Sequence, residues 1–125
     1  MSRCLAACAG LLLAATQMVM AEVKPFPASF RTLEVPADDA TIHVRVGGSG
    51  PAVLILHGYG ETGDMWEPLA IDMAKDHTVI VPDLRGMGLS SHPDGGYDKK
   101  SQASDMESVL KALDVTKVDL VTHDI

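Results

Sequence analysis

Polar segments, two of which contain glycine, follow three apolar runs of the chain, and their residue types could support catalysis. They are residues 57–60 (His-Gly-Tyr-Gly), residues 83–90 (Asp-Leu-Arg-Gly-Met-Gly-Leu-Ser) and residues 122–125 (Thr-His-Asp-Ile). Carboxylates and imidazoles act as nucleophiles or as general acids and bases. Because open α/β sheets place their active sites at the carboxyl ends of their strands, we expect the three segments to share one edge of a sheet.

The strands that position these segments are predicted from the spacing of apolar residues. Residues 33–35 and 42–46 alternate apolar and polar side chains, which predicts two half-buried strands in an antiparallel hairpin. Residues 52–56 are apolar throughout, as a strand covered by helices on both faces requires, and residues 78–81 repeat that pattern. Residues 118–122 are predicted to form the last strand, which we expect to lie exposed.

Two helices are predicted between the buried strands. Asp64 and Glu67 have the spacing of a capping box, and Pro68 falls in the first turn of that helix. The second helix repeats apolar residues on one face, namely Ala103, Met106, Leu110 and Leu113. This order of elements predicts an α/β fold with a mostly parallel sheet, an N-terminal antiparallel hairpin and flanking helices.

The three polar segments, taken in series, resemble the α/β-hydrolase superfamily. A His-Gly follows the third predicted strand, an Asp-x-Arg-Gly-x-Gly-x-Ser follows the fourth, and a His-Asp-Ile follows the fifth. This series of motifs is most similar to the epoxide hydrolase and dehalogenase-like branch of the superfamily. The resemblance implies that residues 32–125 are the N-terminal part of such a domain, ending at the turn that carries the nucleophile. The catalytic His, the triad acid and a cap domain would then lie beyond residue 125, and we expect this chain alone to be inactive.

The resemblance implies that Asp124 is the nucleophile of the reaction. Its carboxylate would attack an electrophilic carbon and form an ester, which water would then hydrolyse. A serine in that role would leave an ether, which water does not readily cleave. Residues 88–92, Gly-Leu-Ser-Ser-His, lack the final glycine of a serine nucleophile motif and follow the wrong strand, so a serine esterase is disfavoured. Thr122 departs from the small residue that the family commonly places two positions before the nucleophile.

The same resemblance assigns the supporting groups of the site. The backbone N–H groups of Tyr59 and Ile125 would form the oxyanion hole. Four residues would build the loops around it, with the charged pair bracing its loop: His57, Gly58, Asp83 and Arg85. A His-Asp pair can also bind a metal ion, but no other His or carboxylate cluster has matching spacing, so we expect neither a metal nor an organic cofactor.

Three functions remain open at this point. The first is a hydrolase that opens an epoxide through an aspartyl ester, with a small electrophilic substrate and water as its partners. The second is a haloalkane or haloacid dehalogenase, although Tyr59 and Ile125 stand where dehalogenases of this fold often use indole or amide side chains to hold the halide. The third is a non-catalytic ligand-binding protein or an inactive fragment.

Residues 1–21 have the composition of a secretory signal peptide. Arg3 precedes an apolar run over residues 5–15, and small residues precede the expected cleavage site. We therefore predict an exported protein, periplasmic or secreted, with no stable membrane span after cleavage and a lead-in segment over residues 22–31. Both cysteines would be removed with the signal peptide. The net charge of −7 is dispersed and no basic cluster occurs, so nucleic acid is not expected as a partner.

Overall fold

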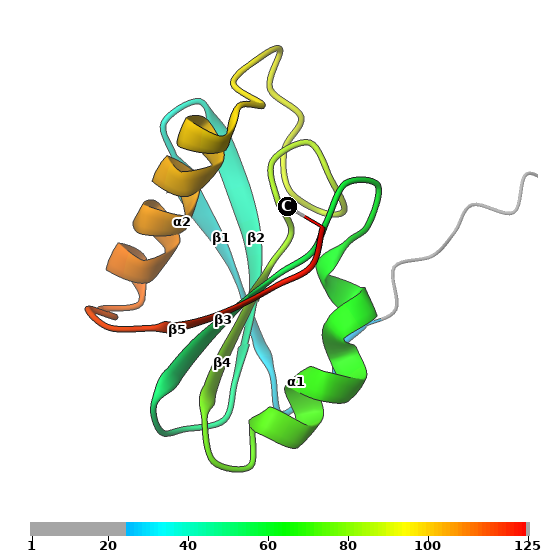
Figure 1. Ribbon diagram of the computed structural model, residues 1–125, viewed down its shortest axis with the longest axis vertical. Helices are drawn as coiled ribbons and strands as arrows, with labels where there is room; N and C mark the ends of the chain where they lie inside the picture. Colours follow the sequence, from blue (N-terminus) through cyan, green and yellow to red (C-terminus); the bar gives the residue numbers. More distant parts are fainter. Residues whose placement is uncertain (1–24, 125) are drawn as a thin grey trace, which may run out of the picture.

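The computed structural model describes residues 25–124, in which three consecutive strands are followed by alternating helices and strands (Figure 1). The elements are β1 (Arg31–Ala37), β2 (Ala40–Gly47), β3 (Ala52–Leu56), the 3-10 turn η1 (Gly63–Trp66), α1 (Glu67–Met73), β4 (Thr78–Pro82), α2 (Lys99–Ala112) and β5 (Asp119–Thr122). Each predicted strand and helix is therefore present. The predicted signal peptide, with both cysteines, and the first residues of the lead-in segment lie outside the described residues.

The five described strands form one sheet in the order β1-β2-β4-β3-β5. β1 pairs with β2, and β2 with β4, in antiparallel register, whereas β3 pairs in parallel with both β4 and β5. Within the described sheet only β2 runs against the other strands. This mixed sheet confirms the predicted α/β fold with its N-terminal antiparallel hairpin.

One helix covers each face of the sheet (Figure 1). Because successive side chains of a strand point to opposite faces, β3 and β4 supply both cores. Leu54, Leu56 and Ile80 pack toward α2 with Met106 and Val109. On the other face lies the second cluster, formed by Phe30, Val53, Ile55, Ala70, Val79 and Val81. Burial on both faces explains why β3 and β4 are apolar runs.

The prediction that β2 is half-buried was wrong. His43 and Arg45, the polar residues of its alternating pattern, are only 7% and 2% exposed. The face that carries them is covered by the segment before β1, where the Phe26 ring lies 5.2 Å from the Arg45 guanidinium, and by the loop after β4. Arg45 is tolerated there because it forms an ion pair with buried Asp83.

Two details of the helices also differ from the sequence prediction. Ala103 is exposed on α2, and Asp105 is buried beside Met106 and Val109. The helix is turned so that the Asp105 carboxylate meets an arginine of the loop after β4, which a search for apolar spacing does not detect. Neither helix has the length and hydropathy needed to cross a bilayer, as far as residues 25–124 are concerned.

The predicted capping box does not form. Neither η1 nor α1 has a side-chain cap on its first turn, and Asp64 instead accepts a hydrogen bond from the Thr62 hydroxyl. Pro68 does lie in the first turn of α1, as predicted. The 3-10 turn inserted before α1 displaces the helix start and separates the two residues of the expected box.

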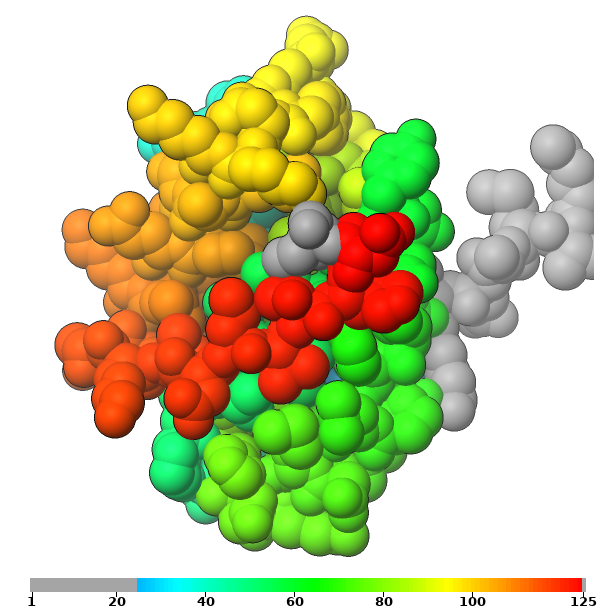
Figure 2. All heavy atoms as spheres, viewed as in Figure 1, coloured from blue at the N-terminus to red at the C-terminus, as the bar shows by residue number. Residues whose placement is uncertain are grey.

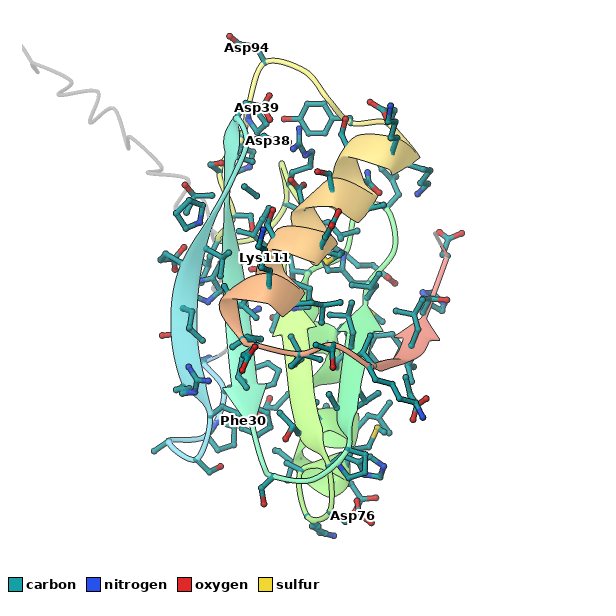
Figure 3. All side chains as sticks on the ribbon, turned by 90° about the vertical axis from the view of Figure 1, so that its left-hand side faces the viewer. Phe30, Asp38, Asp39, Asp76, Asp94 and Lys111 are labelled. Atoms are coloured by element: carbon teal, nitrogen blue, oxygen red, sulfur yellow. The ribbon has the colours of Figure 1, made fainter. Side chains whose placement is uncertain are left out.

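The turn between β1 and β2 lies at the same end of the molecule as the long loop between β4 and α2. Figure 3 shows Asp38 and Asp39 at the tip of the hairpin, close to the loop that carries Asp94, while Asp76 lies at the opposite end. This places the β1–β2 turn, the loop after β4 and the start of α2 together at the end where β3, β4 and β5 terminate. The candidate site is at this end.

Candidate functional site

The three polar segments meet at the carboxyl edge of the parallel strands. The His123 N–H donates to the Leu56 carbonyl at 3.2 Å, and the Leu84 N–H donates to Nε2 of His57 at 2.9 Å. These bonds join the ends of β5, β3 and β4. In Figure 2 the end of β5, in red, lies directly against the green loop that follows β3. The predicted convergence of the segments is therefore present.

Asp124 lies at a sharp turn immediately beyond β5. Its φ angle is 48°, in the left-handed region that L-residues other than Asn, Asp and Gly rarely adopt. Its side chain is exposed. A backbone strained in this way at the end of a parallel strand carries the nucleophile in enzymes with a nucleophile elbow, because the turn holds the side chain clear of the sheet.

Gly58 packs directly on this turn. A Cβ atom at position 58 would lie 2.8 Å from Cβ of Asp124 and 2.9 Å from the carbonyl oxygens of Asp124 and His123. Two of these neighbours are backbone atoms that cannot move without bending the turn. Glycine at position 58 is therefore what allows the loop after β3 to approach Asp124.

His57 is fully buried and holds the loops after β3 and β4 together. Its Nε2 accepts the Leu84 N–H, so the proton of the neutral ring is on Nδ1, which lies 2.9 Å from the Gly58 carbonyl and donates to it. Both ring nitrogens are occupied by backbone groups. The ring therefore fixes loop geometry and has no nitrogen available to activate water.

Asp83 is a buried carboxylate with four hydrogen bonds. It accepts from the Arg45 guanidinium at 2.9 and 3.2 Å, from the Gly63 N–H at 2.7 Å and from the Leu89 N–H at 2.8 Å. Burial acts to raise the pKa of Asp83, but the hydrogen bonds from Arg45, Leu89 and Gly63 outweigh it and hold that pKa below its ordinary value. The carboxylate thus joins β2, η1 and the loop after β4.

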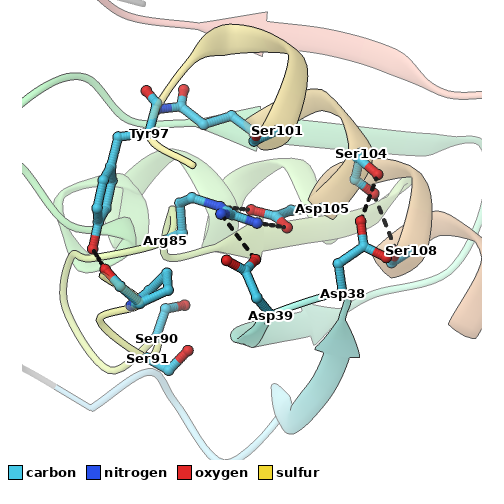
Figure 4. Close-up of polar contacts among 12 residues, drawn as sticks. Asp38, Asp39, Arg85, Ser90, Ser91, Tyr97, Ser101, Ser104, Asp105 and Ser108 are labelled. Carbon is cyan, nitrogen blue, oxygen red and sulfur yellow. Dashed lines mark hydrogen bonds and ion pairs between the residues drawn. The ribbon is translucent and has the colours of Figure 1, made fainter. Parts of the chain in front are cut away.

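Asp83 and Arg85 both contact the loop after β4, but each is held by other partners and the two do not pair with each other. Arg85 points toward α2 and forms two hydrogen bonds of 2.7 Å with Asp105, while its Nη1 lies 3.1 Å from Asp39 (Figure 4). The hydrogen bonds to Asp105 raise the pKa of Arg85 above its ordinary value. Each of the two charged residues pairs with a partner far away in the sequence, Asp83 with Arg45 and Arg85 with Asp105.

Glu61 is a site residue that the sequence analysis missed. One oxygen of its carboxylate, Oε2, accepts the Gly58 N–H at 2.9 Å and lies 3.1 Å from Nδ1 of His123. The hydrogen bond from Gly58, followed by that from His123, lowers the pKa of Glu61. An acidic residue in a polar loop gives no sequence signal of these contacts.

The structure describes one of the two predicted oxyanion donors. Tyr59 is 87% exposed, and its backbone N–H donates to no acceptor among residues 25–124. Ile125 lies outside the described residues. Within the described part of the chain, no group of three or more His, Cys, Asp or Glu side chains is arranged to hold a metal ion.

An apolar groove of about 710 Å³ lies between α2 and β5, next to the site. Figure 2 shows the hollow between the orange helix and the red strand. Its walls include Leu54, Met106, Leu110 and Leu120, and Leu120 is 58% exposed. β5 is thus the exposed strand that the sequence analysis expected.

The fold and this edge of the sheet define the class of protein. Residues 51–125 match the family model described as the alpha/beta hydrolase fold. The chain belongs to the α/β-hydrolase family.

Relatives of the chain include hydrolases. It is 41% identical over 95 residues to a fluoroacetate dehalogenase from Burkholderia sp., covering 72% of this chain and 31% of the relative. It is 36% identical over 83 residues to a soluble epoxide hydrolase from Corynebacterium sp., covering 66% of this chain and 29% of the relative. The solved structure of the epoxide hydrolase CorEH superposes with a TM-score of 0.73 at 32% identity, covering 76% of this chain and 34% of that one. The chain therefore spans about a third of the length of these relatives.

Substitution of Gly58 tests the close approach to Asp124. We expect Gly58→Ala to lower the free energy of unfolding by about 1–3 kcal/mol, because its methyl group would overlap the turn after β5. Gly95→Ala is the matched control, since a Cβ there meets no atom within 4 Å, and it should change stability by less than about 0.5 kcal/mol. Urea unfolding of both variants measures the difference. Equal effects of the two substitutions would contradict the packing described.

The buried Asp83 carboxylate should make stability depend on pH. Because its pKa is lower folded than unfolded, its stabilisation is complete above the unfolded value of about 4 and is lost as the pH falls below that value. Asp83→Asn should cost about 3–5 kcal/mol near neutral pH, since it leaves Arg45 buried without a counter-charge. It should also show a shallower loss of stability in acid than the unmodified protein.

The control for Asp83 is Asp94→Asn, at the exposed tip of the loop after β4 (Figure 3). Denaturant unfolding at a series of pH values compares the variants. If the unfolding free energy of Asp83→Asn falls as steeply in acid as that of the unmodified protein, Asp83 is not the source of this pH dependence.

Proposed function

We propose that this chain supplies the nucleophile-bearing part of a hydrolase that works through an aspartyl ester, with an epoxide as the substrate. The observation that carries the proposal is the backbone of Asp124. Its φ angle of 48° follows a parallel strand, and the Gly58 loop packs against it. The relatedness to an epoxide hydrolase and a dehalogenase supports the same class of chemistry.

In the first step a carboxylate oxygen of Asp124 forms a bond to an epoxide carbon. The carbon–oxygen bond of the ring breaks, and its electron pair remains on the epoxide oxygen, which takes a proton from a general acid or from water. The product is an ester between Asp124 and the opened substrate. An exposed carboxylate on a turn that stands clear of the sheet suits this attack, because the substrate carbon can approach without displacing a strand.

In the second step water attacks Cγ of Asp124 and gives up a proton to a general base. The tetrahedral intermediate carries a negative oxygen, which the N–H groups of Tyr59 and Ile125 would stabilise. Its collapse breaks the ester bond, releases the diol and restores the carboxylate. His57 is not the base in this proposal, because backbone groups occupy both of its ring nitrogens.

Dehalogenation is the second candidate, and the 41% identity to a fluoroacetate dehalogenase favours it. The Asp124 carboxylate would then displace a halide from carbon, and the halide would leave with the bonding electrons. Hydrolysis of the ester would follow as before. The two reactions share the nucleophile and the ester and differ only in the leaving group, so a test of the ester applies to both.

Mass spectrometry of the whole protein encoded by the gene, after brief exposure to epoxides and to haloacids, tests the proposal. We expect a covalent adduct on the peptide that contains Asp124, and none in Asp124→Asn. Asp114→Asn is the matched control, because Asp114 is also exposed with a left-handed φ of 54°. That variant should form the adduct normally.

The class of compound that forms the adduct distinguishes the epoxide hydrolase from the dehalogenase. An adduct from epoxides supports the proposal, and one from haloacids alone would replace it by the dehalogenase. Turnover that proceeds unchanged in Asp124→Asn would contradict both candidates. An adduct confined to another residue would contradict them too.

A further inference from the structure

Glu61 lies between the loop after β3 and the turn after β5, whose relative position determines the geometry of the site. Its Oε2 atom accepts the Gly58 N–H at 2.9 Å on one side and faces Nδ1 of His123 at 3.1 Å on the other. Gly58 begins the loop that carries Tyr59, and His123 immediately precedes Asp124. One carboxylate oxygen thus contacts both the loop of the oxyanion donor and the turn of the nucleophile.

The contact also fixes the shape of the loop. The Glu61 N–H donates back to the Gly58 carbonyl at 3.3 Å, so residues 58–61 form a turn closed by both a backbone and a side-chain hydrogen bond. Gly60 supplies the left-handed φ of 75° that this turn needs. Because the Gly58 N–H donates to Glu61, the next N–H along the chain that can serve the oxyanion hole is that of Tyr59.

The His123 side chain is oriented by two neighbours. A carboxylate can only accept hydrogen bonds, so the Nδ1 atom that faces Glu61 carries a proton. The Trp66 ring lies edge-on to the imidazole, with 6.4 Å between ring centroids. The imidazole is therefore held on the side of the turn that faces the Gly58 loop.

We propose that Glu61 is a positioning residue that sets the Tyr59 N–H relative to Asp124 by holding Gly58 and His123 on one carboxylate oxygen. The proposal rests on the proposed function, since it concerns the oxyanion hole of the ester hydrolysis. Glu61 touches no reacting atom. Its effect is on the second step, because only that step develops charge on the oxygen that Tyr59 would stabilise.

A role confined to the stability of the loop would give a different result. Loosening the loop as a whole would slow both ester formation and ester hydrolysis, or would lower the melting temperature. In either case the ratio of the two rates would stay the same. Misplacing one N–H donor would leave attack by Asp124 nearly unchanged and would slow the hydrolysis of the ester. The two rates must therefore be measured separately.

The test is rapid-quench, single-turnover kinetics on the whole protein, with the epoxide or haloacid that forms the Asp124 ester, for Glu61→Ala and Glu61→Gln. We expect Glu61→Ala to slow ester hydrolysis by about 10-fold or more, short of the roughly 100-fold or greater loss that follows removal of an oxyanion donor. Ester formation should change by less than about 3-fold, so the ester accumulates. Glu61→Gln keeps an oxygen that can accept the Gly58 N–H and should recover part of the rate.

Glu107→Ala on α2, which removes an exposed carboxylate, is the control and should change neither rate. Thermal unfolding shows which variants are folded, and Glu61→Gln provides the kinetic test if Glu61→Ala does not fold. Unchanged hydrolysis, or equal slowing of both steps, would overturn the role of Glu61 and leave the aspartyl ester intact. Absence of any ester in the unmodified protein would overturn the proposed function itself, and the role of Glu61 with it.

Discussion

Asp83 brings a carboxylate to the end of β4, where it is shielded from solvent and hydrogen-bonded to Arg45, Gly63 and Leu89. An ionised carboxylate is stable in such a place only when these donors are all in position, so its burial fixes β2, η1 and the loop after β4 relative to one another. The next residue, Leu84, donates to His57 and so positions the loop after β3. That loop in turn packs on the Asp124 turn through Gly58. The geometry of the candidate nucleophile therefore depends on a buried ion pair two strands away.

The sequence was sufficient to predict the sheet and the place of the site. Apolar runs at residues 52–56 and 78–81 indicate strands covered on both faces, because each side chain of such a strand must be buried. The alternating hairpin and the helical spacing in between then leave few arrangements that obey the right-handed crossover of parallel strands. The polar segments that end these strands follow from the same reasoning, which is why their convergence was predictable before any contact was known.

The polar contacts that shape the site were not predictable in this way. Arg45 and Asp83 are 38 residues apart, and Arg85 and Asp105 are 20 residues apart, so only the folded chain brings each pair together. Hydrophobic periodicity treats Arg45 and Asp105 as solvent-facing, whereas each is buried because it neutralises a buried charge. Glu61 was missed for a related reason: its partners, a backbone N–H and a histidine 62 positions later, leave no trace in local spacing.

We propose that Asp124 forms an ester whose hydrolysis takes place at its own carboxyl carbon. The most direct measurement is turnover of the whole protein in heavy-oxygen water, followed by mass spectrometry of its peptides. If water attacks Cγ of Asp124, the heavy oxygen is retained in the restored carboxylate, and the peptide that contains Asp124 gains mass during turnover. If water attacks the substrate directly, the label appears in the product from the first turnover and the Asp124 peptide remains unlabelled, which would contradict the account.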